Sequence, residues 1–237
     1  SPGSTMAISA RTGPIAITMW VTTVTVRAGI KRSFPVRTVP KDGHRGRFYR
    51  RSMPEDAEFH AVLAESREYE ARERYTPEEY VRLKRAVFSD PFQRIVRADR
   101  RYFVLGKYDG GPRERRLEQV KAQLDAREDS VAFLMRDVPD AWEFWPTKFR
   151  ILAQRATHIV PVLEDTEGSH DWEFGVVSGP EFRPKVFVLK RDWGSEEVEH
   201  EKFHALPAEF VEVLDRDGRV ARWEDEEGLA AAVGDVP

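Results

Sequence analysis

From residue 101 onward, short apolar segments alternate with segments of helical spacing, and this alternation limits the possible folds more than any other feature. The five apolar segments are rich in branched and aromatic residues, and they are 102–105, 131–135, 157–163, 185–189 and 219–223. Continuous apolar strands that are separated by helices are typical of a parallel sheet covered on both faces. The sequence therefore predicts a doubly wound, mostly parallel five-stranded α/β domain over residues 100–237.

Residues 6–52 form a basic segment in which we expect a small β-ribbon. A run of β-branched residues, 15–26, predicts one strand, and a stretch between two prolines, 34–39, predicts another extended piece. Residues 1–51 contain ten Lys or Arg and one acid, a formal charge of +9, which leaves −12 for the rest of the chain. One interpretation is an arm that binds nucleic acid through residues 11–51. The other is an arm that packs on the acidic body of this chain or of a neighbouring subunit in a homo-oligomer.

Residues 53–99 have helical spacing and form a separate helical segment in the prediction. The sequence Thr76-Pro77-Glu78-Glu79 indicates a helix start, because Thr is a good cap, Pro fits the first turn and acids favour the amino end. Ser89-Asp90-Pro91 indicates a second start of the same kind. Residues 1–5, which precede Met6, have the composition of a cloning remnant, and we expect no role for them.

The composition excludes several classes of protein. The chain of 237 residues has no cysteine, which excludes disulfides, thiolate catalysis, Cys-ligated zinc and iron–sulfur clusters. Without disulfides, the expected compartment is the cytoplasm. The longest apolar run, 15–26, falls well short of the roughly 20 residues that span a bilayer. We therefore expect no membrane partner.

The first candidate for a site is the glycine-rich turn Gly106-Lys107-Tyr108-Asp109-Gly110-Gly111, between a predicted strand and a predicted helix. In doubly wound sheets, ligands bind beyond the carboxyl ends of the strands. Glycines there let the backbone approach a phosphate or a sugar closely. Arg113 follows in the first helical turn, where it opposes the helix dipole, so a bound anion is one explanation. A flexible turn with solvated arginines is the alternative. Arg136-Asp137, after the second strand, is a weaker cluster of the same kind.

The strongest cluster follows the third predicted strand. An acidic loop that contains Asp165 and Ser169 leads into a helix whose first turn carries Asp171 and Glu173. A carboxylate at this place can act as a nucleophile at an anomeric carbon, or stabilise an oxocarbenium-like state. An apolar neighbour such as Trp172 would help to tune its pKa. The alternative is that both acids simply favour the amino end of the helix.

A competing motif is His200-Glu201-Lys202-Phe203-His204, which matches the H-E-x-x-H pattern of zinc hydrolases. Charged residues surround it and Pro207 follows closely, which is typical of a solvated surface helix. We therefore expect no metal site and no cofactor.

The segment Gly168-Ser169-His170-Asp171-Trp172-Glu173-Phe174-Gly175, followed by Pro184-Lys185-Val186-Phe187-Val188-Leu189, resembles the nucleoside 2-deoxyribosyltransferase-like and TIR-like group of flavodoxin-like domains. The resemblance covers about residues 101–237. It implies a flavodoxin-like fold, with Glu173 as the nucleophile or glycosidic-bond carboxylate. It further implies that residues 106–108 shape a sugar site and that Asp137 or Asp165 binds base or ribose.

Together these observations predict an N-glycosidic-bond hydrolase or transferase that acts on a nucleoside, nucleotide or NAD-like ligand. The alternative is a non-catalytic nucleotide-sensing or oligomerising module with a basic arm. The expected catalytic residues are Glu173 and Asp171. The expected ligand-binding residues are Gly106, Lys107, Tyr108, Arg113, Asp137, Asp165, Ser169 and Trp172.

Overall fold

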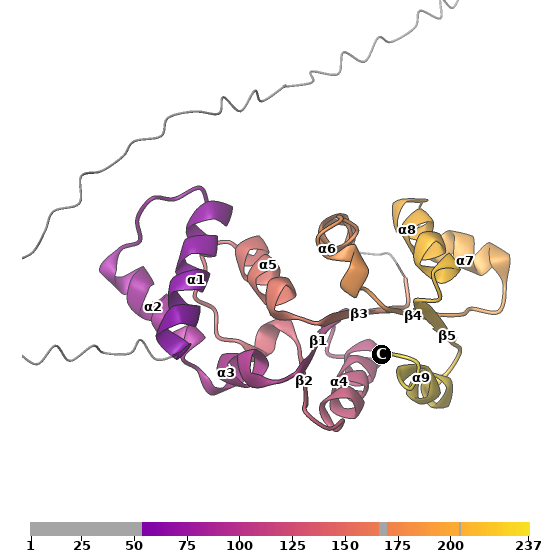
Figure 1. Cartoon of the computed structure of the whole chain (residues 1–237). Coiled ribbons are helices and arrows are strands. Elements are labelled where there is room, and N and C mark those ends of the chain that lie inside the picture. Colours follow the sequence, from indigo (N-terminus) through magenta and orange to yellow (C-terminus); the bar gives the residue numbers. More distant parts are fainter. Residues whose placement is uncertain (1–53, 166–169, 204) are drawn as a thin grey trace, which may run out of the picture. The chain divides into compact units, whose positions relative to one another are not determined.

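The computed structural model describes residues 54–165, 170–203 and 205–237. The chain divides into two compact units, residues 1–48 and 49–237, and the first lies wholly outside the described residues. The predicted β-ribbon and basic arm, 6–52, and the predicted cloning remnant therefore lie outside the described residues as well. The fold is that of the second unit, shown in Figure 1.

Helices and strands alternate along this unit, and several helices begin with a proline in the first turn. The helices are α1 (Pro54–Tyr69), α2 (Pro77–Val87), α3 (Asp90–Arg97), α4 (Pro112–Asp125), α5 (Trp145–Arg155), α6 (His170–Val177), α7 (Glu196–Lys202), α8 (Ala205–Arg216) and α9 (Glu226–Val233). The strands are β1 (Arg100–Leu105), β2 (Ser130–Phe133), β3 (His158–Leu163), β4 (Val188–Arg191) and β5 (Val220–Trp223). Two short 3-10 turns are η1 (Met135–Asp137) and η2 (Arg183–Lys185).

The five strands form one parallel sheet in the order β2-β1-β3-β4-β5. In the register of the central strands, Phe103 of β1 is opposite Phe133 of β2 and Ile159 of β3. This order is that of flavodoxin-like folds, in which the chain reverses direction across the sheet between β1 and β3. The predicted doubly wound five-stranded fold is thereby confirmed.

Alternate residues of each strand enter two separate cores, because successive side chains point to opposite faces of a sheet. Phe103 and Leu105 pack on the face that α5, α6 and α8 cover, whereas Tyr102 and Val104 pack on the face that α4 and α9 cover. Figure 1 shows the two helical layers above and below the sheet. Burial on both faces explains why the buried parts of β1, β2 and β3 are apolar without a polar alternation.

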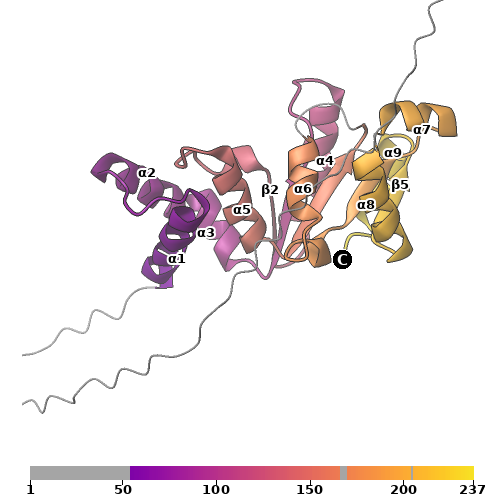
Figure 2. The same cartoon turned by 90° about the horizontal axis from the view of Figure 1, so that it is seen from above.

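The helices α1, α2 and α3 belong to the same core as the α/β part. Phe59, Leu83 and Phe92 from these three helices are buried in one cluster with Phe103 of β1. Figure 2 shows the three helices beside α5, and Arg155 of α5 forms an ion pair with Glu58 of α1 at 2.9 Å. The predicted segment of 53–99 is thus helical, and its apolar side chains pack against the sheet.

The predicted start of α2 is confirmed in its details. Thr76 caps the helix by accepting a hydrogen bond from the Glu79 N–H at 3.2 Å, and the Glu79 carboxylate accepts one from the Thr76 N–H at 2.7 Å. Ser89 caps α3 in the same position. The reciprocal bonds between Thr76 and Glu79 satisfy backbone donors that a helix leaves unpaired at its amino end.

Two elements differ most from the prediction, beyond shifts of one or two residues at other strand ends. The fourth strand was expected over 185–189, but β4 lies at Val188–Arg191, and Val186 makes only an isolated bridge to Ile159. The segment around His200, which the sequence predicts to form a surface helix, is divided between α7 and α8. Pro207 explains the division, because proline fits only the first turn of a helix and so favours a new start near Ala205.

Candidate functional site

The candidate site lies where β1 and β3 end side by side, at the point where the strand order reverses. Gly106 and Lys107 follow β1, and Glu164 and Asp165 follow β3. Gly106 packs closely on α4, since a Cβ atom there would lie 2.7 Å from Cδ1 of Leu117 and would require that side chain to move. The absence of a side chain lets α4 pack directly beneath the turn that leaves β1.

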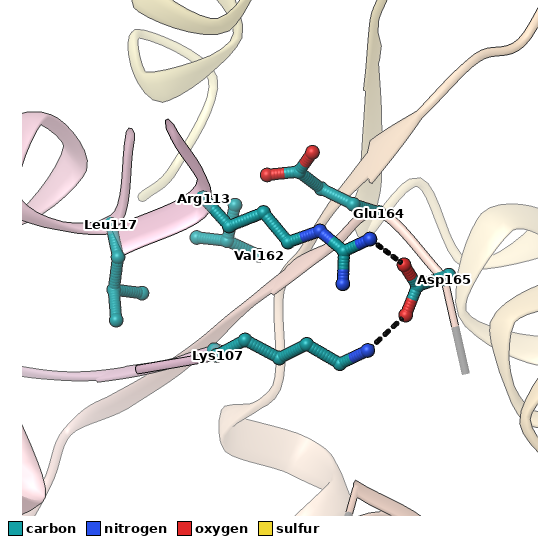
Figure 3. Close-up of a pocket in the computed structure, with 7 residues that line it drawn as sticks. Lys107, Arg113, Leu117, Val162, Glu164 and Asp165 are labelled. Atoms are coloured by element: carbon teal, nitrogen blue, oxygen red, sulfur yellow. Dashed lines mark hydrogen bonds and ion pairs between the residues drawn. The ribbon is translucent and has the colours of Figure 1, made fainter. Parts of the chain in front are cut away.

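Asp165 holds two cations that come from the other side of the reversal point. Its Oδ1 lies 2.6 Å from Lys107 Nζ, and its Oδ2 lies 2.8 Å from Arg113 Nη2, as Figure 3 shows. The Asp165 side chain is only 1% exposed, whereas Lys107 and Arg113 are 21% and 31% exposed. The predicted residues Lys107, Arg113 and Asp165 therefore come together, with the carboxylate inside and the cations at the surface.

Glu164, which the sequence reasoning did not select, is the centre of a second ion-pair cluster. Arg116 Nε and Nη2 donate to its two carboxylate oxygens at 2.9 and 2.5 Å, and Arg191 Nη1 donates at 3.0 Å. Trp193 Nε1 donates to the Glu164 backbone carbonyl at 2.9 Å. This cluster joins α4 to the ends of β3 and β4.

The two carboxylates account for the arginines at the amino end of α4. Arg113 and Arg116 oppose the helix dipole, but each is paired with an acid that follows β3. The sequence suggested a bound anion as the partner of these arginines. In the structure, Glu164 and Asp165 already supply negative charge to them.

A cavity of about 310 Å³ opens beside this cluster at the same edge of the sheet. Its lining residues are Leu105, Gly106, Tyr108, Met135, Trp145 and Glu173. Tyr108 and Trp145 are 45% and 43% exposed, an unusual degree for large aromatic side chains. The structure therefore brings the predicted residues Gly106, Tyr108 and Glu173 together around one cavity, and Trp145 and Met135 join them.

Charged neighbours and partial burial act on Tyr108. Loss of hydration raises the pKa of its phenol above the ordinary value of 10.0, and the Glu173 carboxylate raises it further. The Arg136 guanidinium lies over the ring, 5.0 Å from its centroid, and is itself paired with Glu114 and Glu118. Tyr108 therefore remains a neutral phenol that can donate a hydrogen bond across the physiological range.

Other predicted residues lie elsewhere or outside the described residues. Asp137 pairs with Lys121 at 2.7 Å and accepts a hydrogen bond from the Leu134 N–H at 2.9 Å, so its carboxylate holds the turn after β2. Ser169 lies outside the described residues. Asp171 and Trp172 belong to α6, but their side chains are outside the described part.

The zinc-like motif can be followed only in part, because the side chains of His200, Glu201 and His204 are outside the described part of the chain. Among the described residues, no group of three or more His, Cys, Asp or Glu is placed to hold a metal ion. Within the same residues, no helix has both the length and the apolar character that crossing a membrane requires.

Sequence reasoning missed Trp145 and Met135 as cavity residues. Trp145-Pro146 marks the start of α5, and an aromatic residue at a helix start near the carboxyl edge of a sheet is a usable signal. Met135 begins η1, two residues beyond the end of β2 at the same edge. Both could have been found by extending the strand-end rule to the second strand and to the helix after it.

The fold and the site define a flavodoxin-like α/β protein with a carboxylate-bearing cavity at the reversal point of its sheet. The chain belongs to the DUF8170 family, a family of unknown function, which matches residues 57–237. That match begins inside α1 and covers every later element described above. Comparisons with curated proteins and with solved structures give no match.

Proposed function

We propose that the protein cleaves the N-glycosidic bond of a nucleoside, nucleotide or NAD-like ligand, or transfers the sugar, and that Glu173 is the essential carboxylate. The observation that carries this proposal is the presence of Glu173 in one cavity with Tyr108 and Trp145. The cavity volume of about 310 Å³ is within the range of pockets for small organic ligands. Its position at the reversal point is the usual ligand site of doubly wound sheets.

The aromatic side chains suit a planar base. Tyr108 follows β1 and Trp145 begins α5, so the cavity carries an aromatic side chain from each of two elements. Both expose a substantial part of their rings, and exposed aromatic rings gain from stacking against a flat π-system. A nucleobase meets this requirement, and its sugar then has room near Gly106 and Glu173.

Glu173 supplies negative charge to the anomeric carbon. As the bond to the base breaks, the base leaves with the bonding electron pair and the sugar carbon becomes electron-poor. The carboxylate either forms an ester bond with that carbon or stabilises the positive charge without bonding. Attack by water then gives hydrolysis, and attack by a second base gives transfer.

The test is a panel of NAD, deoxynucleosides and their monophosphates, incubated with the full chain and analysed for free base by HPLC. A Glu173→Gln change keeps the shape of the side chain but removes its charge, so turnover should fall by orders of magnitude with little change in melting temperature. Glu212→Gln is the matched control, because Glu212 is an exposed residue of α8 that does not line the cavity. Its turnover should equal that of the unchanged chain.

Two outcomes would overturn the proposal. If Glu173→Gln leaves a demonstrated glycosidase activity intact, the carboxylate has been assigned wrongly. If the panel yields no free base while a nucleotide still binds, the protein is a sensor rather than an enzyme.

A further inference from the structure

We propose that Lys107 and Arg113 form a phosphate subsite, which makes 5′-phosphorylated nucleosides the preferred ligands over free nucleosides. This inference rests on the proposed function, because it assigns one end of the ligand whose base and sugar occupy the cavity at Glu173. It adds a preference for a negatively charged group on the ligand, which the residues that line the cavity do not provide.

Asp165 and the two cations that it binds have different roles. Asp165 is almost wholly buried, and both of its carboxylate oxygens are engaged by cations. It is therefore badly placed to bind a base or a ribose. Lys107 and Arg113 have three and five N–H donors, and the contacts described here to Asp165 and Asp109 use only part of them. Their partly exposed ends are the groups that a ligand can reach.

The charge around Lys107 and Arg113 favours an anionic ligand. Among the described residues, Lys107 and Arg113 share the buried carboxylate of Asp165. Asp109, which is 4.0 Å from Arg113 and 40% exposed, offsets the remaining positive charge only weakly. Glu164 does not reduce it further, because Arg116 and Arg191 already surround that carboxylate. An anion that accepts several hydrogen bonds is the ligand chemistry that fits, and a phosphate does so strongly with lysine and arginine.

Lys107 and Arg113 lie next to the cavity that contains Glu173. Gly106 lines both the cavity with Glu173 and a small hollow with Lys107, Arg113 and Asp165. Figure 3 shows Lys107 and Arg113 extending side by side toward Asp165. The hollow has space for about one water molecule, about 10 Å³, so a phosphate would lie at its mouth over Gly106 rather than inside it. A ligand with its base at Tyr108 and its phosphate at Lys107 would then pass its sugar over Gly106.

The experiment compares binding of adenosine 5′-monophosphate, adenosine and inorganic phosphate by titration calorimetry. The proteins are the full chain and its Lys107→Met, Lys107→Arg, Arg113→Gln and Lys121→Met variants. Lys121→Met is the matched control, because Lys121 is also a partly buried lysine of this unit paired with an aspartate, at 2.7 Å from Asp137, but it does not line the hollow. Each variant is first checked by its melting curve.

The monophosphate should bind about tenfold or more tightly than adenosine, and Lys107→Met or Arg113→Gln should remove about tenfold of that preference. Lys107→Arg and Lys121→Met should keep it. Equal affinities, no binding of either compound, or an equal loss for both in Lys107→Met would overturn the subsite. Inorganic phosphate that binds as tightly as the monophosphate would overturn the nucleotide assignment.

The subsite and the proposed function fail separately. Cleavage of adenosine and its monophosphate with equal efficiency would retain the function and reject the subsite. A phosphate preference in binding without any release of base would support the subsite and reject the enzyme.

Discussion

Lys107 and Asp165 each lie two residues beyond the end of a central strand, and an ion pair of 2.6 Å joins them across the boundary between β1 and β3. The pair therefore lies at the one place in the sheet where the strand order reverses. Because the carboxylate is buried and the ammonium group is partly exposed, Asp165 fixes the position of the cation that a ligand meets. The same relationship underlies the selectivity proposed for 5′-phosphorylated ligands.

Removal of the buried charge of Glu164 should destabilise the fold. Glu164→Gln leaves the guanidinium groups of Arg116 and Arg191 without their anion, so the free energy of unfolding should fall by about 3 kcal/mol. Urea unfolding measures this change. Glu226→Gln is the control, since Glu226 is 66% exposed and 3.9 Å from Arg116, and its effect should stay below about 1 kcal/mol.

A double variant tests whether Glu164 and Arg116 act as a pair. Glu164→Gln combined with Arg116→Gln should cost less than the sum of the single changes, because the second change removes one of the cations that the first leaves unpaired. Strict additivity in the urea experiment would mean that the two side chains do not stabilise the fold through one another.

Alanine substitutions at two glycines should change stability in opposite directions. Gly106→Ala places a Cβ atom 2.7 Å from the buried Leu117, and overpacking of this kind costs about 1–3 kcal/mol. Gly175→Ala places a Cβ atom in open space on an exposed helical position, and the gain in helix propensity should be about 0.5–1 kcal/mol. Melting temperatures of both variants check the prediction. A stable Gly106→Ala variant would show that the Leu117 side chain can move away from the turn.

The ring of Tyr108, rather than its hydroxyl, should determine ligand use. Tyr108→Ala should lower kcat/KM for base release by about tenfold, whereas Tyr108→Phe should stay within about threefold of the unchanged chain. Because the pKa of Tyr108 is raised above 10.0, its ionisation should not contribute to the pH profile below that value. Phe144→Ala is the control, since Phe144 is as exposed but does not line the cavity. Equal losses in the Phe and Ala variants would show instead that the hydroxyl is required.

The helix cap of α2 should resist acid. The hydrogen bond from the Thr76 N–H and the Arg72 guanidinium lower the pKa of Glu79 to about 2. Because the pKa is lower in the folded state, this contribution is complete above the ordinary value of 4.5 and is lost as the pH falls through about 2. A carboxyl NMR titration should find the low midpoint, and Arg72→Gln should raise it. Arg74→Gln, a change at a neighbouring exposed arginine, should leave it in place.

The fold followed from the sequence where apolar periodicity decided the outcome, and the end of β4 differed because charge pairing decided it. The apolar run ends at Leu189, yet β4 continues through Lys190 and Arg191. Lys190 is buried because its ammonium group lies 2.6 Å from Glu199. No local pattern reveals that a charged residue has a partner on the following helix.

The candidate site shows the same division between local and distant information. The rule that ligands bind beyond the strand ends identified Lys107 and Asp165. It did not select Glu164, whose side chain pairs with Arg116, whereas that of Asp165 pairs with Lys107. Nor did it show that Asp137 is engaged by Lys121 from the preceding helix. Pairings of this kind depend on the three-dimensional arrangement.

Because α1, α2, α3 and the sheet share one core, a fragment that folds on its own has to include all of them. Phe59, Leu83 and Phe92 are buried in one cluster with side chains of the sheet and of α5. A fragment cut at residue 100 would therefore expose an apolar surface that favours self-association. The stretch matched by the family begins at residue 57, within α1. The family match therefore includes the three helices together with the sheet, and a shortened or recombined form of this chain has to keep them together.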